Sequence, residues 1–326
     1  QKTAYEISTR DWSSDVCSSD LKLNNKKSIK YKMDSLNETL LLTLWCHYTK
    51  FTDKFKSSLL NLYLINIPYN AINEEIIEKM IEMENIKALE RVYKIKKELI
   101  TKINVDDLSQ KGKLEIIKWL WMKSKTDDLE FRDPIWAIKN AAFYGHLDII
   151  KWFWEKSKNK DLKFFYSEWI VDISAQNGHL EIIEWLWKKS KTDNLRFLYS
   201  ENAVDNAALN GQLKIIKWFW EKYKTNNLRF LFSEDAVDNA SLEGHLEIIE
   251  WFWEKSKTDE LEFLYSEWAV NCAALKGHLN IIEWFWEKSK TDNIEFLYSM
   301  ETFIYKIENE NLYVIEWFKE KIKFNI

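Results

Sequence analysis

Histidine is the residue type whose spacing in this sequence first suggests chemistry. Four of the five histidines directly follow one of a regularly spaced set of glycines: His146, His179, His245 and His278. Imidazole is a common metal ligand, but a metal ion needs several ligands within a few ångströms of one another. Equivalent positions in stacked helical units lie about 10 Å apart, and no second ligand type recurs beside these histidines. The spacing therefore predicts no metal site, and we expect the imidazoles to bond backbone groups of adjacent turns.

Carboxylates form a second recurring set, at the position six residues before a glycine. Asp106, Asp172, Asp205 and Asp238 occupy this position, and Lys139 and Asn271 interrupt the series. A stripe of carboxylates could bind a basic or amide-rich segment of a partner. Each carboxylate could instead bond the backbone of the adjacent loop, as short polar side chains often do. The sequence leaves both roles open.

Patterns typical of enzymes are missing from the sequence, which has no Gly-rich phosphate loop, no nucleophile elbow and no paired Cys/His arrangement. The 18 tryptophans could in principle stack on bases. They recur beside Ile and Phe, however, where core packing explains them, and the net charge of −5 is opposite to what phosphate binding requires. We expect a non-enzymatic protein with no cofactor and no nucleic-acid partner, whose tryptophans lie mainly in the core.

Composition narrows the class of protein further. With six glycines and two prolines in 326 residues, a fold built on many tight turns is excluded. Hydrophobic residues make up 46% and charged residues 30%, which is typical of a folded, soluble chain. No apolar run approaches the roughly 20 residues that span a membrane. Three cysteines do not form a disulfide framework, so we expect a cytoplasmic protein. We also expect the protein to be monomeric and to have no membrane contact.

An internal repeat organises most of the chain. All six glycines recur at one constant interval: Gly112, Gly145, Gly178, Gly211, Gly244 and Gly277. Each unit predicts a short, small-faced helix that ends at the glycine and a longer helix with a broad apolar stripe. Ser200, Ser233 and Ser266 are predicted N-caps of the short helix. A seventh unit keeps the phase with Glu310 in the glycine position, and a degenerate unit can precede the set near Glu84.

The recurring motif Ala-Ala-x-x-Gly-His-Leu-x-Ile-Ile, together with its period, resembles the ankyrin repeat over roughly residues 101–326. The chain departs from the usual Thr-Pro-Leu-His, which is replaced by Asn-Ala-Val-Asp at 202–205 and its equivalents. This tryptophan-rich variant is similar to ankyrin proteins expanded in large DNA viruses and protists. The resemblance implies an all-α, ankyrin-type helical repeat solenoid with a 33-residue period, in which the short helices line a concave surface.

Three segments are predicted along the chain. Residues 1–32 are a head that is not native or is disordered, because residues 11–21 resemble the translation of a sequencing adapter, and Met33 is the expected initiator. Residues 33–100 form an N-terminal helical cap that can include the degenerate unit. Residues 101–326 form the array, with six clear units and a C-terminal capping unit. In that last unit Lys306 and Lys319 replace an alanine and a tryptophan of earlier units, as a capping face requires.

The two residues before each glycine, hereafter the variable pair, change between units while the residues around them are kept, and we expect both positions to be exposed. They are Phe143 and Tyr144, Gln176 and Asn177, Leu209 and Asn210, Leu242 and Glu243, and Leu275 and Lys276. Interchangeable recognition residues give this pattern, although drift on an unused surface gives it too. We expect a scaffold that binds a protein partner through its concave face and loops. The alternatives are a viral adaptor that recruits ubiquitin-ligase machinery through its N-terminal segment, and a redundant copy with no selected ligand.

Overall fold

The computed structural model describes residues 53–127, 129–131, 134–193, 195–258, 261–292, 294–299 and 312–322. Every regular element in these ranges is a helix, as predicted. The expected initiator Met33, the segment 11–21 and Lys306 lie outside the described residues. No helix in the described ranges combines the length and the apolar character that crossing a membrane requires.

The chain divides into two compact units, of which the first contains residues 1–103 and 118–130. Its helices are α5 (Asp53–Asn66), α6 (Glu74–Glu82), α7 (Ile86–Ile95), α8 (Lys97–Ile100) and most of α10 (Leu114–Thr126), with a 3₁₀ turn at Tyr69–Ala71. The turn between α6 and α7 has Glu84 in the left-handed region at φ 51°. Asn85 then caps α7 by accepting the N–H of Ala88 at 3.0 Å. The segment near Glu84 is thus a helix pair with the same kind of turn as the glycine-containing units.

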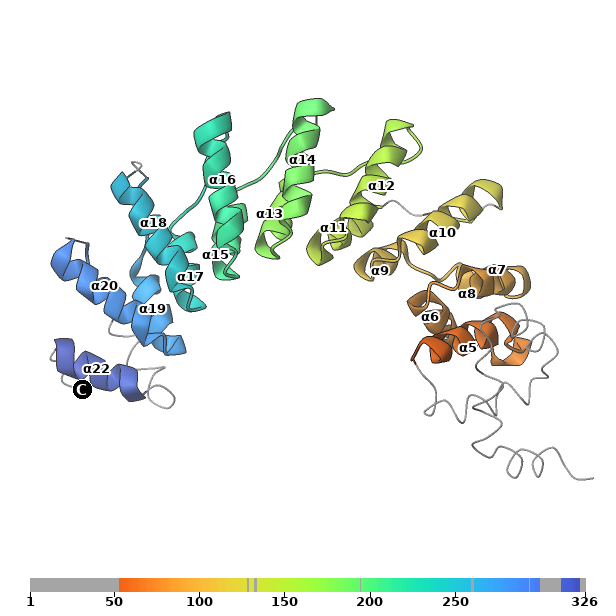
Figure 1. Cartoon of the computed structure of the whole chain (residues 1–326), viewed down its shortest axis with the longest axis horizontal. Coiled ribbons are helices and arrows are strands. Elements are labelled where there is room, and N and C mark those ends of the chain that lie inside the picture. The colour runs from red at the N-terminus through yellow and green to blue at the C-terminus, as the bar shows by residue number, and fades with distance from the viewer. Residues whose placement is uncertain are drawn as a thin grey trace, which may run out of the picture. The chain divides into compact units, whose positions relative to one another are not determined.

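The second unit contains residues 104–117 and 131–326, and its helices alternate between short and long (Figure 1). The short helices are α9 (Val105–Gln110), α11 (Ile135–Tyr144), α13 (Glu168–Gln176), α15 (Asn202–Leu209), α17 (Asp235–Leu242) and α19 (Glu267–Lys276). The long helices are α12 (Leu147–Lys158), α14 (Leu180–Thr192), α16 (Leu213–Asn226), α18 (Leu246–Thr258), α20 (Leu279–Thr291) and α22 (Leu312–Ile322). The fold is all-α, and its helix pairs repeat with a ~33-residue period, as in an ankyrin-like helical repeat solenoid.

Small side chains allow successive short helices to pack closely. In α15, Ala203, Val204, Ala207 and Ala208 are fully buried, and α15 contacts both α13 and α17. Gly211 turns the chain after α15 with φ 71°, a conformation that strains any residue with a Cβ. A Cβ at this position would also lie 2.7 Å from the His245 ring of the next unit. The repeat glycine is therefore required both by its backbone conformation and by the close approach of the following unit.

Aromatic side chains join successive long helices. The indoles of Trp187 and Trp218 meet edge to face, with centroids 6.1 Å apart and an interplanar angle of 90°. Trp220 and Trp251 repeat this contact at 6.0 Å in the next unit. Phe219, between the two tryptophans of α16, is fully buried. Such pairs contribute about 0.5–1.5 kcal/mol beyond the area that they bury. Trp218 and Trp220 are buried, as expected for core residues, whereas Trp185 and Trp187 of α14 are half-buried.

The sequence does not decide whether the loop at 195–199 is extended or helical, and in the structure it is not helical. Residues 195–200 carry no regular secondary structure. Their neighbours along the stack hold them, because the Tyr166 hydroxyl accepts the N–H of Leu198 at 3.1 Å. Phe197 of this loop contacts Trp187 at a centroid distance of 5.3 Å. Each loop is thus part of the packing between units and not a free connection.

Candidate functional site

The acidic stripe predicted from the sequence is mostly buried. Asp172, Asp205 and Asp238 expose 7%, 3% and 7% of their surface. Asp205 accepts two hydrogen bonds from Ser233 in the next unit, from its N–H at 3.0 Å and its hydroxyl at 2.7 Å. The same pair of bonds, hereafter the serine link, joins Asp172 to Ser200 and Asp238 to Ser266. The sequence left open whether these carboxylates bind a partner or bond the adjacent loop. In the structure all three bond a serine of the adjacent loop.

Burial raises the pKa of all three carboxylates. Removal from water raises the pKa of Asp205 from 3.8 to about 6, although the two bonds from Ser233 oppose that rise. Burial likewise raises the pKa of Asp172 and of Asp238. A basic partner segment would have to break the serine links to reach these oxygens. We therefore do not place the partner contact on these aspartates.

The predicted serine caps need one correction. Ser266 is the N-cap of α19, and its hydroxyl accepts the N–H of Trp268 at 3.1 Å. Ser200 and Ser233 stand one residue before the cap position, which Glu201 and Glu234 occupy with helical backbone angles. The hydroxyl of Ser200 still accepts the N–H of Asn202 at 3.2 Å. Each serine hydroxyl accepts an N–H of the helix that follows and donates to the aspartate of the preceding unit. The bond to the aspartate is therefore the same whether or not the serine is the N-cap residue.

The serine link changes at both ends of the series. Asn271 accepts the N–H of Ser299 at 3.0 Å through Oδ1, but its buried Nδ2 has no hydrogen-bond partner among the described residues. Pro134 occupies the serine position opposite Asp106, which is half-buried in α9, and proline has neither an N–H nor a hydroxyl to donate. Lys139 occupies the aspartate position in α11 and cannot accept such bonds. The two junctions that flank α11 therefore lack the link.

Three of the repeat histidines, His146, His179 and His278, bond backbone carbonyls of the preceding unit, as predicted. His146 donates from Nε2 to the carbonyl of Gln110 at 3.0 Å, and His179 does so to that of Phe143 at 2.9 Å. His278 bonds the carbonyl of Leu242 at 3.2 Å. Among the described residues, no group of three or more His, Cys, Asp or Glu side chains is arranged to hold a metal ion. Each accepting carbonyl belongs to the first residue of a variable pair, or to Gln110 at the equivalent position of α9. The bond uses only the main chain of that residue, so its side chain can differ between units.

The variable pairs lie at the ends of the short helices. Phe143 and Tyr144 are exposed, as are the second members Asn210, Glu243 and Lys276. The expectation that both positions are exposed was wrong for five of the ten residues, which are half-buried: Gln176, Asn177, Leu209, Leu242 and Leu275. One side chain reaches back to the preceding unit, where Asn210 donates to the carbonyl of Gln176 at 3.0 Å. The structure thus places the predicted variable positions along one series of helix ends and buries Asp172, Asp205 and Asp238 away from that surface.

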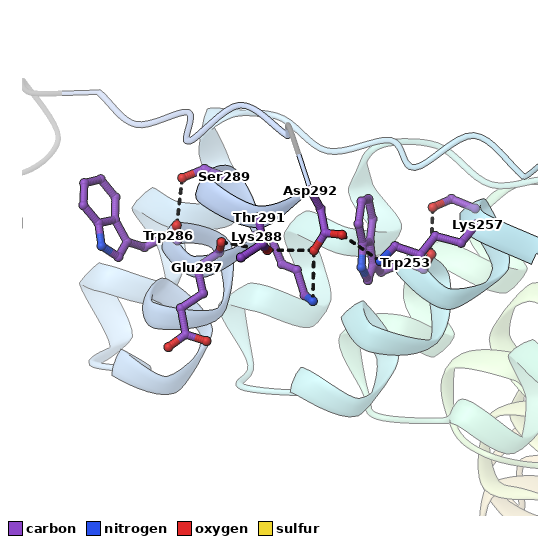
Figure 2. Close-up of polar contacts among 9 residues, drawn as sticks. Trp253, Lys257, Trp286, Glu287, Lys288, Ser289, Thr291 and Asp292 are labelled. Carbon is purple, nitrogen blue, oxygen red and sulfur yellow. Dashed lines mark hydrogen bonds and ion pairs between the residues drawn. The ribbon is translucent and has the colours of Figure 1, made fainter.

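Lysines of two neighbouring long helices meet one carboxylate and so join successive units. Figure 2 shows Asp292, just after α20, between Lys288 of its own helix and Lys257 of the preceding long helix. Lys257 donates to Asp292 at 2.9 Å, and Lys288 lies 3.1 Å from the same carboxylate. The bond from Lys257 is the main reason that the pKa of Asp292 falls to about 2. Lys257 also lies over the ring of Trp253, 4.5 Å from its centroid.

Three exposed tryptophans on the short helices are a surface feature that sequence reasoning missed. Trp136, Trp169 and Trp268 expose 60%, 37% and 53% of their surface. All three stand nine residues before a repeat glycine, whereas the core tryptophans follow the glycine. That difference in position was the signal available in the sequence. Between Trp136 and Trp169 lies the ammonium of Lys139, 4.6 Å and 5.2 Å from the two ring centroids.

Comparison with known proteins adds no relative. No protein-family model matches the chain, and no curated protein matches it in sequence.

Proposed function

We propose that this chain is a non-catalytic scaffold of the ankyrin class that binds a protein partner through the exposed face of its short helices and their variable pairs. The observation that carries the proposal is that the bonds between units do not involve the side chains that vary from unit to unit. The histidines bond main-chain carbonyls of the variable residues, and the serine links lie buried beneath the same face. Side chains of the variable pairs can change without disturbing either set of bonds.

Two further features support the ankyrin assignment. The regularly repeating unit combines a left-handed glycine, a following histidine that bonds the preceding unit, and a long second helix. The chain departs from the usual ankyrin pattern in Asn-Ala-Val-Asp at 202–205 and in its aromatic content, as in the packing of Phe197 on Trp187. The tryptophan-rich variant in large DNA viruses and protists is the group that these departures fit best, and it is part of the proposal.

An affinity pull-down from eukaryotic cell lysate tests the proposal. The bait is the full chain, and the test variant carries Asn210→Lys, Glu243→Lys and Lys276→Glu, three exposed positions at short-helix ends. The matched control carries Asn226→Lys, Glu250→Lys and Lys217→Glu, which make the same three charge changes at exposed positions of long helices.

We expect a partner that binds the wild type and the control and is lost from the test variant, with all three baits equally folded by circular dichroism. Loss from the control alone, or retention by both variants, would contradict the assignment of binding to the short-helix face. Recovery of no partner by the wild type would contradict the scaffold function in that cell type and favour a redundant copy.

A further inference from the structure

One short helix in the array differs from the others in the charge and exposure of its side chains. α11 is the sole described short helix of the second unit without an acidic residue, and Lys139 stands where three of the others carry a buried aspartate. Its exposed side chains include Trp136, Phe143 and Tyr144. With Lys139 and with Trp169 of α13 they form what we call the aromatic patch.

The patch follows the geometry of a helix face. Trp136, Lys139 and Phe143 stand at positions i, i+3 and i+7 of α11, so they share one side of the helix over a length of about 10 Å. Trp169 belongs to the neighbouring helix, and the two helices are in contact. The patch is thus the size of a few residues of a bound segment, much smaller than the roughly 800 Å² per partner of a typical domain–domain interface.

The side chains of the patch are held in place before any partner binds. The Lys139 ammonium lies over both indoles, 4.6 Å from the centroid of Trp136 and 5.2 Å from that of Trp169. Tyr144 accepts a hydrogen bond from Gln110 of α9 at 3.0 Å, and its ring contacts Phe143 with centroids 4.8 Å apart. The carbonyl of Phe143 is fixed by His179. A preorganised surface loses less conformational entropy when it binds.

The charge of the patch selects its partner. Lys139 has no carboxylate within ion-pair distance in the part of the chain that the structure describes, whereas many other lysines of the array do. The indoles hold its ammonium by cation–π attraction, which leaves its N–H donors unsatisfied by any anion. An incoming carboxylate would complete the charge pairing, and apolar side chains beside it would cover the exposed aromatic rings.

We infer that the aromatic patch binds a short acidic segment of a partner protein, with a carboxylate on Lys139 and large apolar side chains on Trp136 and Phe143. The inference rests on the proposed function, because it names the chemistry of one partner segment for the same short-helix face. It also accounts for the missing serine link at α11, since the position that carries the buried aspartate elsewhere carries the recognition lysine here.

A randomised library of twelve-residue peptides, presented to the full-length protein, provides the test. Peptides that bind are then synthesised with a fluorescent label, and their dissociation constants are measured by anisotropy for the wild type, Trp136→Ala, Lys139→Glu and Trp268→Ala. The last variant is the matched control, since Trp268 has the same place in its unit and a similar exposure but Asn271 in place of the lysine. Thermal unfolding verifies that all four proteins are folded.

We expect the selected peptides to be acidic and to contain large apolar residues. Trp136→Ala and Lys139→Glu should each weaken their binding by at least about tenfold, and Trp268→Ala should change it less than about twofold. A peptide with its key acid changed to lysine should regain affinity for Lys139→Glu.

Three outcomes would overturn the inference. Selection of basic or quaternary-ammonium peptides would show that the indole pair takes a cation in place of Lys139. Acidic peptides that ignore both patch variants would move recognition elsewhere while leaving the scaffold function intact. Selection of no peptide would exclude a short linear segment, and the lysate experiment would then judge the scaffold function separately.

Discussion

The buried carboxylate of Asp205 leads to a prediction about stability and pH. In Asp205→Asn, the amide oxygen can still accept the N–H of Ser233, as Asn271 does for Ser299 in this structure. The variant loses the bond from the Ser233 hydroxyl and leaves a buried amide nitrogen without a partner, as found for Asn271. These losses cost the variant a similar amount at every pH. The variant also removes a carboxylate whose charged form is disfavoured by burial.

The sign and size of the pH effect follow from the pKa. The folded pKa of Asp205 is about 6, and its ordinary value is 3.8. The folded state therefore binds more protons between these values, and its contribution to stability falls as the pH rises through that window. At 1.36 kcal/mol per unit, the full effect is about 3 kcal/mol, of which about 2 kcal/mol lies between pH 4.5 and pH 7.

Urea unfolding followed by far-UV circular dichroism measures this effect. Relative to the wild type, Asp205→Asn should become about 2 kcal/mol more stable as the pH rises from 4.5 to 7. Asp161→Asn removes an exposed carboxylate and serves as the control, with no comparable trend expected. Equal m-values for all three proteins are required before the midpoints are compared, because repeat arrays can unfold in steps. A difference between Asp205→Asn and the wild type that stays constant over this range would refute the argument from burial.

Three further predictions concern the frame. Gly211→Ala should destabilise the array by more than the roughly 1–2 kcal/mol that a left-handed alanine costs, because its Cβ would crowd His245. The same substitution should cost less in a protein that also carries His245→Ala. Equal thermal shifts in both backgrounds would contradict the crowding. Asn271→Asp should stabilise the protein by about 1 kcal/mol at pH 4.5 by completing the link to Ser299, and urea midpoints should show the gain shrinking at pH 7. Deletion of residues 201–233 joins Ser200 to Glu234 and so recreates the same junction; we expect a folded but less stable array by circular dichroism, whereas complete unfolding would contradict independent stacking of units.

Periodic features of the fold were predictable from the sequence because they depend on local rules. The regularly recurring glycine marks the left-handed turn, and a broad apolar stripe marks the long helix. The bonding role of His146 and His179 followed from their regular place after that turn. The predictions for Met33 and Lys306 remain predictions, because these residues lie outside the described ranges.

The role of the aspartates was not predictable from their own position. Asp205 lies 28 residues before Ser233, and whether the two side chains meet depends on how one unit stacks on the next. The same recurrence at Asp172 and Ser200 was a usable signal once units were compared in pairs. The exposure of Trp136 and Trp268 was not predicted either, because their different place in the unit was visible in the sequence but was not used to separate them from the core tryptophans.

The way the frame is bonded explains how one array could acquire different binding surfaces. His179 recognises the carbonyl of Phe143, and His278 recognises that of Leu242, so the bond is the same whether the residue is aromatic or aliphatic. Substitutions at the exposed Glu243 and Lys276 should therefore change stability by no more than about 0.5 kcal/mol, while changing the surface that a partner meets.

The aspartate position obeys the opposite rule. A change at Asp205 or Asp238 removes a buried link, so a loss of binding in such a variant would not distinguish a lost contact from a loosened array. Lys139 is the informative exception, because its unit lacks the link and yet keeps Ala137, Ile138, Ala141 and Ala142 fully buried. The array thus tolerates the absence of the serine link at both junctions of α11, where the small residues remain fully buried. Under the proposed function, that tolerance allows Lys139 to serve recognition at a position that elsewhere carries a buried aspartate.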